Sequence, residues 1–242
     1  MDFFDVPYSV VEVNPLTKKE IAFSKDYRKV PIVQMRGDTL TDSPLIIEAL
    51  LQRLGETSAV PASDLEAFAS PEARRWAEWA DKQLAVLLFP NITRNFSESY
   101  QAFGYVWSVP TFGLADKAAN QVLGATAMWA AQGKLKKKYG IDDERAALFA
   151  ALTKWSAALD GGDGGDGGGQ PFAGGDRPHL GDVAVFGCIH AIHGLDTHAD
   201  VLRGAGLEGW YGRMQRVLGY DVSDGDGGRG GCRGLKEEAA AA

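Results

Sequence analysis

Cysteine is scarce in this chain, which has two among its 242 residues, Cys188 and Cys232. They stand far apart and form no Cys-x-x-Cys motif, so the sequence implies neither a disulfide framework nor a reactive thiol pair. Cys188 lies in an apolar helical stretch, where we expect it to pack in a core, and Cys232 lies among glycine and arginine residues. We therefore assign no catalytic residue from the sequence.

Long apolar runs and excess positive charge are also lacking. No apolar run approaches the roughly 20 residues that a membrane-spanning helix needs, and the N-terminus has no signal-like basic and apolar regions. Acidic residues exceed basic ones, 32 against 25, and the resulting net charge of −7 disfavours nucleic acid as a partner. With 45% hydrophobic residues, the chain is long enough to bury a sizeable core and to hold two domains.

Residues 27–33, Tyr-Arg-Lys-Val-Pro-Ile-Val, have the β-branched composition of a strand but include a proline. Pro31 has no N–H to donate to a ladder, so a central strand would not tolerate it unless the chain turns there. A cis Val30–Pro31 bond would turn the backbone N–H and C=O of Val30 outward, where an extended peptide can pair as an added strand. Residues 37 and 38, Gly-Asp, then predict a tight turn.

A helix is predicted to begin after Asp42, with Ser43 as its N-cap and Pro44 at its first helical position. Apolar residues follow at helical spacing, at Ile46, Ile47, Leu50, Leu51 and Leu54. The free N–H groups of the first turn attract a carboxylate, and Asp42 would pair with an amino group beside it. These two charges match the γ-glutamyl end of glutathione. The predicted glutathione contacts are Val30, Pro31, Asp42 and Ser43. In the alternative interpretation, Asp42 and Ser43 only cap the helix.

The chain divides by composition into an α/β part, residues 1–56, and a helical part, residues 71–220, joined by a linker at 57–70. Residues 7–14 are predicted to form a further strand of the α/β part. In the helical part, helices are predicted at 71–88, 116–139, 143–159, 182–193 and 207–218. We expect a flexible Gly/Asp insert at 160–170 and a disordered tail at 221–242.

Histidine occurs only in the second half of the chain. His179 stands three residues before Asp182, which is the spacing of a helix cap and its reciprocal partner. His190, His193 and His198 include two positions about one helical turn apart, but no carboxylate or thiol stands at matching spacing. We therefore expect core or surface histidines and predict no metal site.

Several segments, taken in order, resemble the membrane-associated prostaglandin E synthase type 2 family. They are VPYSVVEVNP at 6–15, YRKVPI at 27–32, DS at 42–43, WAEWAD at 76–81, FPN at 89–91 and PHLGDVAVFG at 178–187. The resemblance covers most of the chain outside the glycine-rich insert and the tail. It implies an α/β plus all-α fold, with a truncated thioredoxin/glutaredoxin-like domain followed by a C-terminal helical domain of glutathione-transferase type.

Members of that family begin the thioredoxin-like domain with a strand and a Cys-x-x-Cys turn, which this chain does not contain. Residues 1–6 look like the end of the family's first helix. We therefore expect the coding sequence upstream of Met1 to add a short strand and a Cys-x-x-Cys turn. The compartment stays undetermined between cytoplasm and organelle, with membrane association through that upstream segment as a further alternative.

The resemblance implies a glutathione-binding isomerase that converts the prostaglandin H endoperoxide to the E form. A thiolate would polarise or attack the peroxide bond, and a proton would then leave the carbon that bears the new ketone. The implied partners are glutathione and a small lipophilic substrate. Haem held through glutathione, peripheral membrane association and a homodimer are implied by the resemblance alone.

Two other functions compete with the isomerase. One is a non-catalytic glutathione-binding scaffold of the same fold, which the absent Cys-x-x-Cys motif favours for the chain as it stands. The other is a glutathione transferase or reductase that acts on unknown electrophiles. Whether the chain is an enzyme is therefore left open by the sequence.

Overall fold

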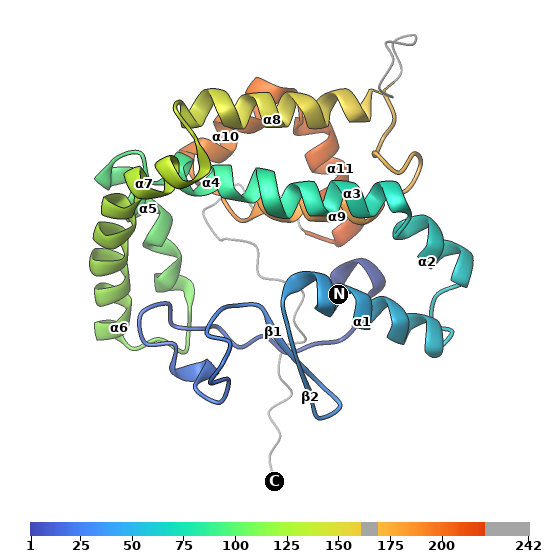
Figure 1. The fold of residues 1–242 in the computed structure, drawn as a ribbon, viewed down its shortest axis with the longest axis horizontal. Coiled ribbons are helices and arrows are strands. Elements are labelled where there is room, and N and C mark those ends of the chain that lie inside the picture. Colours follow the sequence, from blue (N-terminus) through green and yellow to red (C-terminus); the bar gives the residue numbers. More distant parts are fainter. Residues whose placement is uncertain (161–168, 221–242) are drawn as a thin grey trace.

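The computed structural model describes residues 1–160 and 169–220. Most of the predicted Gly/Asp insert, the predicted tail and Cys232 lie outside the described residues. The described part is mostly helical, with one small antiparallel sheet (Figure 1). The α-helices are α1 (Ser43–Glu56), α2 (Ala62–Phe68), α3 (Pro71–Trp79), α4 (Ala85–Ile92), α5 (Phe96–Ala102), α6 (Leu114–Ala119), α7 (Ala125–Tyr139), α8 (Glu144–Leu159), α9 (Leu180–His190), α10 (Asp196–Ala205) and α11 (Glu208–Leu218).

Shorter helical turns complete the set. Two π-helical turns, η3 (Ala80–Leu84) and η5 (Asn120–Gly124), join α3 to α4 and α6 to α7. Three 3-10 turns are η1 (Asp2–Phe4), η2 (Lys19–Ile21) and η4 (Phe103–Ser108). No helix among the described residues is both long and apolar enough to span a membrane.

The sheet is a hairpin of β1 (Ile32–Met35) and β2 (Asp38–Thr41), in which Met35 pairs with Asp38 and Ile32 with Thr41. Its two-residue turn has positive φ at both positions, 54° at Arg36 and 90° at Gly37. A turn of this kind matches the twist of the strands that it joins. The turn predicted at residues 37 and 38 therefore lies one residue earlier, because Asp38 already belongs to β2.

The strand predicted at residues 7–14 is wrong. Among the described residues, β1 and β2 pair with each other and form the whole sheet. A strand needs a neighbouring edge about 4.8 Å away to complete its ladder. Residues 7–14 have no such neighbour, so they run without regular structure despite their β-branched composition.

The predicted helices are confirmed, with boundaries shifted by a few residues. A continuous helical rod of α6, η5 and α7 covers the predicted 116–139 and ends at Gly140, whose φ of 64° closes the helix. Short helices α5 and α10 were not predicted, because seven to ten residues carry little periodic signal. Helix α2 lies inside the segment 57–70.

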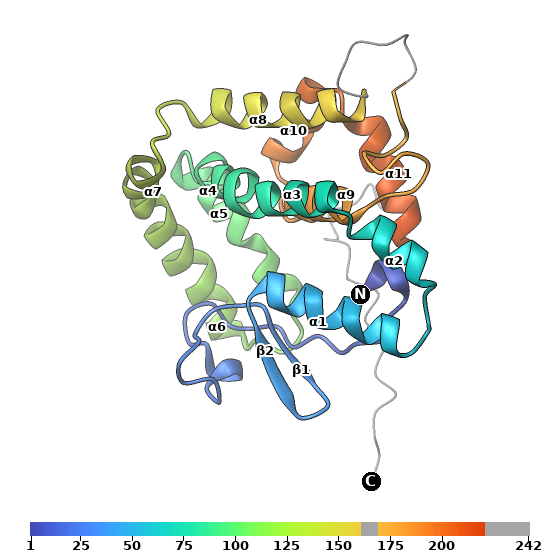
Figure 2. The ribbon, with the colours of Figure 1, turned by 45° about the vertical axis from the view of Figure 1, so that its right-hand side comes forward.

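The helices form layers that two views show in the same order. Helices α8 and α10 lie above α3, α4 and α9, while α1 and the hairpin lie below them (Figures 1 and 2). Helix α9 packs along α3 at close range. A Cβ atom on Gly181 would stand 2.5 Å from the Cβ of Trp76, so only glycine permits this approach.

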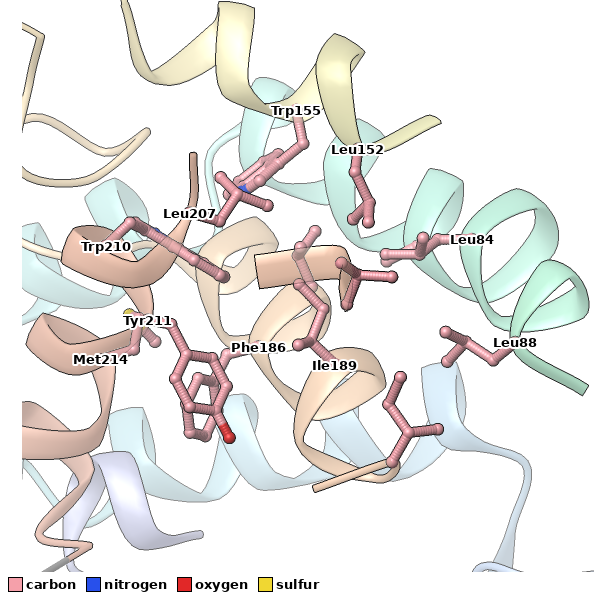
Figure 3. Close-up of a cluster of buried hydrophobic side chains, with 14 of the residues drawn as sticks. Leu84, Leu88, Leu152, Trp155, Phe186, Ile189, Leu207, Trp210, Tyr211 and Met214 are labelled. Carbon is pink, nitrogen blue, oxygen red and sulfur yellow. The ribbon is translucent and has the colours of Figure 1, made fainter. Parts of the chain in front are cut away.

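The main core lies between α3–α4, α8, α9 and α11 and is built of large apolar side chains (Figure 3). Trp155 of α8 makes edge contacts with Trp76 of α3 and Trp210 of α11, at ring-centroid distances of 5.1 and 5.5 Å. Trp155 has no exposed surface, and Trp210 has 2%. Such ring pairs add to the apolar area that the helices bury.

The predicted cap of α9 is confirmed as a capping box. Both oxygens of Asp182, which is fully buried, accept several hydrogen bonds. Trp210 Nε1 donates at 2.9 Å, and the backbone N–H groups of Ala173, Gly174 and His179 donate at 3.0, 3.2 and 3.1 Å. Burial acts to raise the pKa of Asp182, but hydrogen bonds from His179 and Trp210 outweigh it and hold the pKa below its ordinary value.

Replacing Asp182 with alanine should lower the free energy of unfolding by more than about 3 kcal/mol, because several buried donors lose their acceptor at once. Urea unfolding followed by circular dichroism measures the change. Asp176→Ala is the matched control, since Asp176 is exposed and lies on the same loop, and it should change stability by less than about 0.5 kcal/mol. Equal effects of the two substitutions would contradict the assigned role of Asp182.

Candidate functional site

The four predicted glutathione contacts flank the open end of the hairpin. Ile32 is paired with Thr41 there, and the ladder ends with this pair. Val30 and Pro31 come directly before Ile32 in the chain, and Asp42 and Ser43 come directly after Thr41.

The Val30–Pro31 peptide bond is cis, which the sequence had left undecided. The ladder ends at Ile32, so the backbone of Val30 lies outside the sheet. The side chain of Val30 is 60% exposed, which is high for a large apolar residue beside a strand. Val30 is therefore accessible to a ligand from solvent.

Asp42 occupies the N-cap position of α1, and Ser43 is the first helical residue, so the helix begins one residue earlier than predicted. No side chain caps this helix, so the alternative in which Asp42 and Ser43 serve only as caps finds no support in the hydrogen bonding. The backbone of Asp42 has φ 73° and ψ 127°, a combination outside the allowed regions for a non-glycine residue. Such conformations concentrate at ligand sites, because the surrounding structure must hold them.

A large groove of about 1310 Å³ lies beside the hairpin. It is lined by Val30, Pro31 and β1 and by residues 6–13. Val10 and Val11 of the latter segment are 50% and 70% exposed. Asp42 and Ser43 do not line the groove. The structure therefore places two of the predicted contacts in the groove and two beside it.

Three basic residues line the groove, Lys18, Arg28 and Lys29, against two acidic ones, Glu12 and Glu20. Arg28 and Lys18 hold the loop together: Lys18 Nζ donates to the Arg28 carbonyl at 2.9 Å, and Arg28 donates to the Lys18 carbonyl at 3.3 Å. Sequence reasoning missed these side chains as part of the site. A signal was present, because residues 18–29 carry five basic residues in an acidic chain.

A buried amide pair attaches this loop to the helical part. Asn14 has no exposed surface and Asn120 has 1%, and Asn120 Nδ2 donates to Asn14 Oδ1 at 3.2 Å. The same oxygen accepts the backbone N–H groups of Leu16 and Thr17, at 3.0 and 3.1 Å. The contact joins residues more than one hundred positions apart, so the sequence offered no signal for it.

Cys188 packs against the main core, as expected from the sequence. Burial, with a smaller contribution from Asp81, raises the pKa of the Cys188 thiol to about 11. The thiol is therefore protonated at neutral pH and is a poor nucleophile. Cys188 does not line the groove.

The three histidines of the predicted metal alternative surround Tyr211. His190 Nδ1 lies 2.6 Å from the Tyr211 hydroxyl, and His193 stacks on His190 with ring centroids 5.3 Å apart. Burial, aided by the nearby His193, lowers the pKa of both His190 and His198 to about 4. These two histidines are therefore neutral at pH 7. Within residues 1–160 and 169–220, no group of three His, Cys, Asp or Glu side chains is arranged to hold a metal ion.

Two curated proteins are similar to this chain over most of its length. Prostaglandin E synthase 2 of Mus musculus is 33% identical over 90% of this chain and 65% of its own length. Prostaglandin E synthase 2 of Danio rerio is 31% identical over 90% of this chain and 66% of its own length. The chain thus spans just under two thirds of these relatives. No family model matches it.

Substituting Asp42 with glycine should raise the free energy of unfolding by about 1 kcal/mol, because glycine relieves the positive φ at a smaller entropic cost. Chemical denaturation of the two proteins measures the difference. Asp38→Gly on the same hairpin is the matched control and should be destabilising, since Asp38 is a strand residue without positive φ. Destabilisation by both substitutions would show that Asp42 is not strained.

Proposed function

The chain belongs to the prostaglandin E synthase 2 family, and from this premise we propose that it is a glutathione-dependent isomerase of a prostaglandin endoperoxide. The observation that supports the proposal is the end of the hairpin ladder at the pair Ile32 and Thr41, which Pro31 and Asp42 adjoin in the chain. Two motifs that are separated by a turn and two strands act there as one site.

Each of these residues has a distinct task in binding glutathione. The backbone of Val30, held outside the ladder next to Pro31, pairs with the extended tripeptide. The exposed carboxylate of Asp42 pairs with the ammonium group of the γ-glutamyl end. The uncapped start of α1 at Ser43 faces the neighbouring carboxylate with its free N–H groups.

The groove beside the hairpin supplies the place for a lipophilic substrate. Its walls carry exposed valines, and its three basic residues offer a partner for a carboxylate on the same molecule. Glutathione contributes the thiol, and the reaction is an isomerisation, so no atom is gained or lost. The protein binds both molecules and orients them.

A second function, a non-catalytic glutathione-binding scaffold, is favoured by one specific observation. The single cysteine among the described residues lies away from the groove, and its raised pKa keeps it protonated. A scaffold would use the same four contacts and differ from the isomerase only in its failure to turn over substrate.

Asp42→Ala should weaken glutathione binding by about 1.5–3 kcal/mol, because the ligand's ammonium group loses a charged partner. Calorimetric titration measures both affinities. Asp38→Ala on the same hairpin controls for lost surface charge. Unchanged affinity in Asp42→Ala, with both variants folded, would remove glutathione from this site.

Product formation from the endoperoxide in the presence of glutathione separates isomerase from scaffold. We expect turnover that depends on glutathione and that Cys188→Ser leaves unchanged, because the Cys188 thiol is protonated and distant from the groove. Glutathione binding without turnover above the buffer rate would establish the scaffold. Turnover that is lost in a folded Cys188→Ser protein would contradict the role given to the glutathione thiol.

A further inference from the structure

The histidine cluster around Tyr211 joins three consecutive helices. His190 belongs to α9, His198 to α10 and Tyr211 to α11, and His193 lies in the turn between α9 and α10. The rings form a continuous group. Their centroids are 5.3 Å apart for His190 and His193, 4.8 Å for His193 and His198, and 5.0 Å for His198 and Tyr211. Three imidazoles therefore share the region where α9, α10 and α11 meet.

Aromatic rings surround this cluster. Phe186 stacks on His190 with ring centroids 5.0 Å apart and lies beside Tyr211 (Figure 3), and Tyr220 lies 4.5 Å from His190. His198 is 8% exposed, and its Nε2 atom has no hydrogen-bond partner in the described part of the chain. A charged imidazole carries a proton on both ring nitrogens, so Nε2 would then be a buried donor without an acceptor. Such a group destabilises the folded state.

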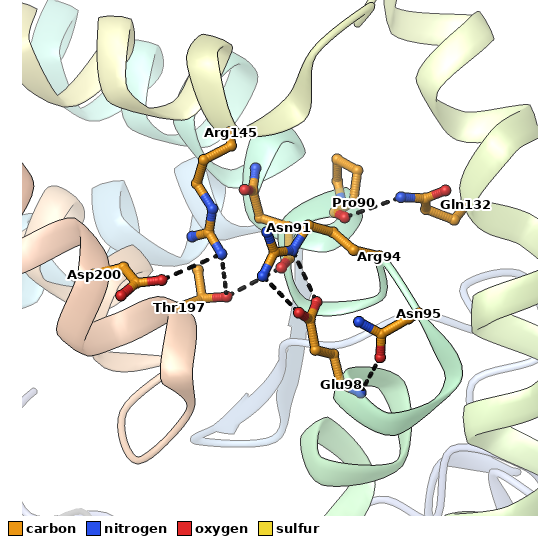
Figure 4. Close-up of polar contacts among 9 residues, drawn as sticks. All are labelled: Pro90, Asn91, Arg94, Asn95, Glu98, Gln132, Arg145, Thr197 and Asp200. Atoms are coloured by element: carbon orange, nitrogen blue, oxygen red, sulfur yellow. Dashed lines mark hydrogen bonds and ion pairs between the residues drawn. The ribbon is translucent and has the colours of Figure 1, made fainter.

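The acidic residues of α10 face away from the cluster. Asp196 and Asp200 each stand two positions from His198, which is about 200° around the helix. Asp200 pairs instead with Arg145 of α8, at 3.5 Å (Figure 4). Neither carboxylate therefore balances a charge on His198.

The charged groups of α9 and α11 also lie elsewhere. Asp182 caps the opposite end of α9. On α11, Arg213 donates to the Pro171 carbonyl at 3.0 Å, while Glu208 and Arg216 are exposed. Among the described residues, only burial and the neighbouring histidines shift the pKa of the cluster's two most buried imidazoles. A positive charge in the cluster would thus meet other imidazoles and no carboxylate.

The hydroxyl of Tyr211 connects the cluster to α11. It lies 2.6 Å from His190 Nδ1 and 3.5 Å from His193 Nδ1. Burial raises the pKa of Tyr211, so the hydroxyl keeps its proton and remains a donor. A neutral imidazole has one nitrogen that accepts a proton, whereas a charged imidazole has none. Protonation of His190 therefore removes the acceptor that faces Tyr211.

We propose that His190, His193 and His198 form an acid-sensitive latch, which holds α10 and α11 on α9 while the imidazoles are neutral and releases them when the imidazoles bind protons. In the released state each histidine meets water, which stabilises its charged form. The latch does not depend on glutathione binding, because none of these histidines lines the groove.

The direction of the pH effect follows from the lowered pKa values. Burial, with smaller contributions from neighbouring histidines, lowers the pKa of His190 and His198 from 6.5 to about 4. Above pH 6.5 these histidines are neutral in both states. As the pH falls from 6.5 towards 4, the released state binds protons first, so stability is lost across this window. The pKa of Asp182 is below its ordinary value of 3.8, so its contribution is lost only at lower pH.

Urea unfolding at pH 7.5 and at pH 5.0 tests the latch. In the wild type, the equilibrium constant for unfolding should rise between these two pH values by at least about tenfold for each of the two buried histidines. His198→Phe keeps an aromatic ring beside His193 and Tyr211 but cannot bind a proton. It should therefore reduce the rise by about tenfold, with little change in stability at pH 7.5.

Thr197→Val is the matched control. Thr197 precedes His198 on α10, is 2% exposed and does not titrate. Its hydroxyl donates to the Asn91 carbonyl at 3.0 Å, so the substitution should lower stability. The reduction should be the same at both pH values, because no proton binds at this position.

Two measurements on the wild type need no substitution. In a titration followed by nuclear magnetic resonance, the imidazoles of His190 and His198 should protonate with midpoints below pH 5 in the folded protein. Hydrogen exchange, corrected for the intrinsic effect of pH, should show that the amides of α10 and α11 open at pH 5.0 while those of α5 and α7 stay protected.

Three results would overturn the proposal. One is a pH effect on stability that is as large in folded His198→Phe as in the wild type. Another is protonation of both buried histidines near pH 6.5. The third is simultaneous opening of all helices at pH 5.0, because protonation would then unfold the whole protein and would not release α10 and α11 from α9.

Discussion

The structure depends on the buried carboxylate of Asp182. It fixes the start of α9 through the capping box and holds Trp210 of α11 by a direct hydrogen bond. Trp210 in turn contacts Trp155 of α8, and Trp155 contacts Trp76 of α3. One acidic group thus sets the positions of four helices, because each partner that it orders is itself a core side chain.

Helix α9, which Asp182 caps, is also in contact with the helix that begins at the candidate site. Leu180, the first residue of α9, packs in a second apolar cluster with Phe68 and Ala73, and Ile47 and Leu51 of α1 pack against that cluster. Helix α1 is therefore seated on the helical part, and its N-terminus presents Asp42 at the open end of the hairpin. The unusual backbone of Asp42 lies where the strand, the helix and the proposed ligand meet, which agrees with strain being stored at a binding site.

The groove and the helical rod of α6, η5 and α7 are linked through the loop around Asn14. The amide of Asn120, in this rod, holds Asn14 and with it the loop that contributes Lys18 to the groove. Lys19 of this loop also approaches Asp116 at 3.8 Å. The helical rod thus helps to hold in place the loop that lines the groove.

Much of the local structure could be read from the sequence. Apolar spacing predicted the long helices, and the pair His179 and Asp182 predicted the cap, because short-range sterics and hydrogen bonding govern these features. A proline within a strand pattern raised a cis Val30–Pro31 bond as one solution, and the structure decided it. Only the tertiary structure decided that residues 7–14 form no strand, that Asp182 accepts from Trp210, and that Arg28 joins Val30 in one groove. These outcomes depend on contacts between segments that are distant in the sequence. Local composition does not show which strand edge, hydrogen-bond donor or groove residue will lie beside a given residue.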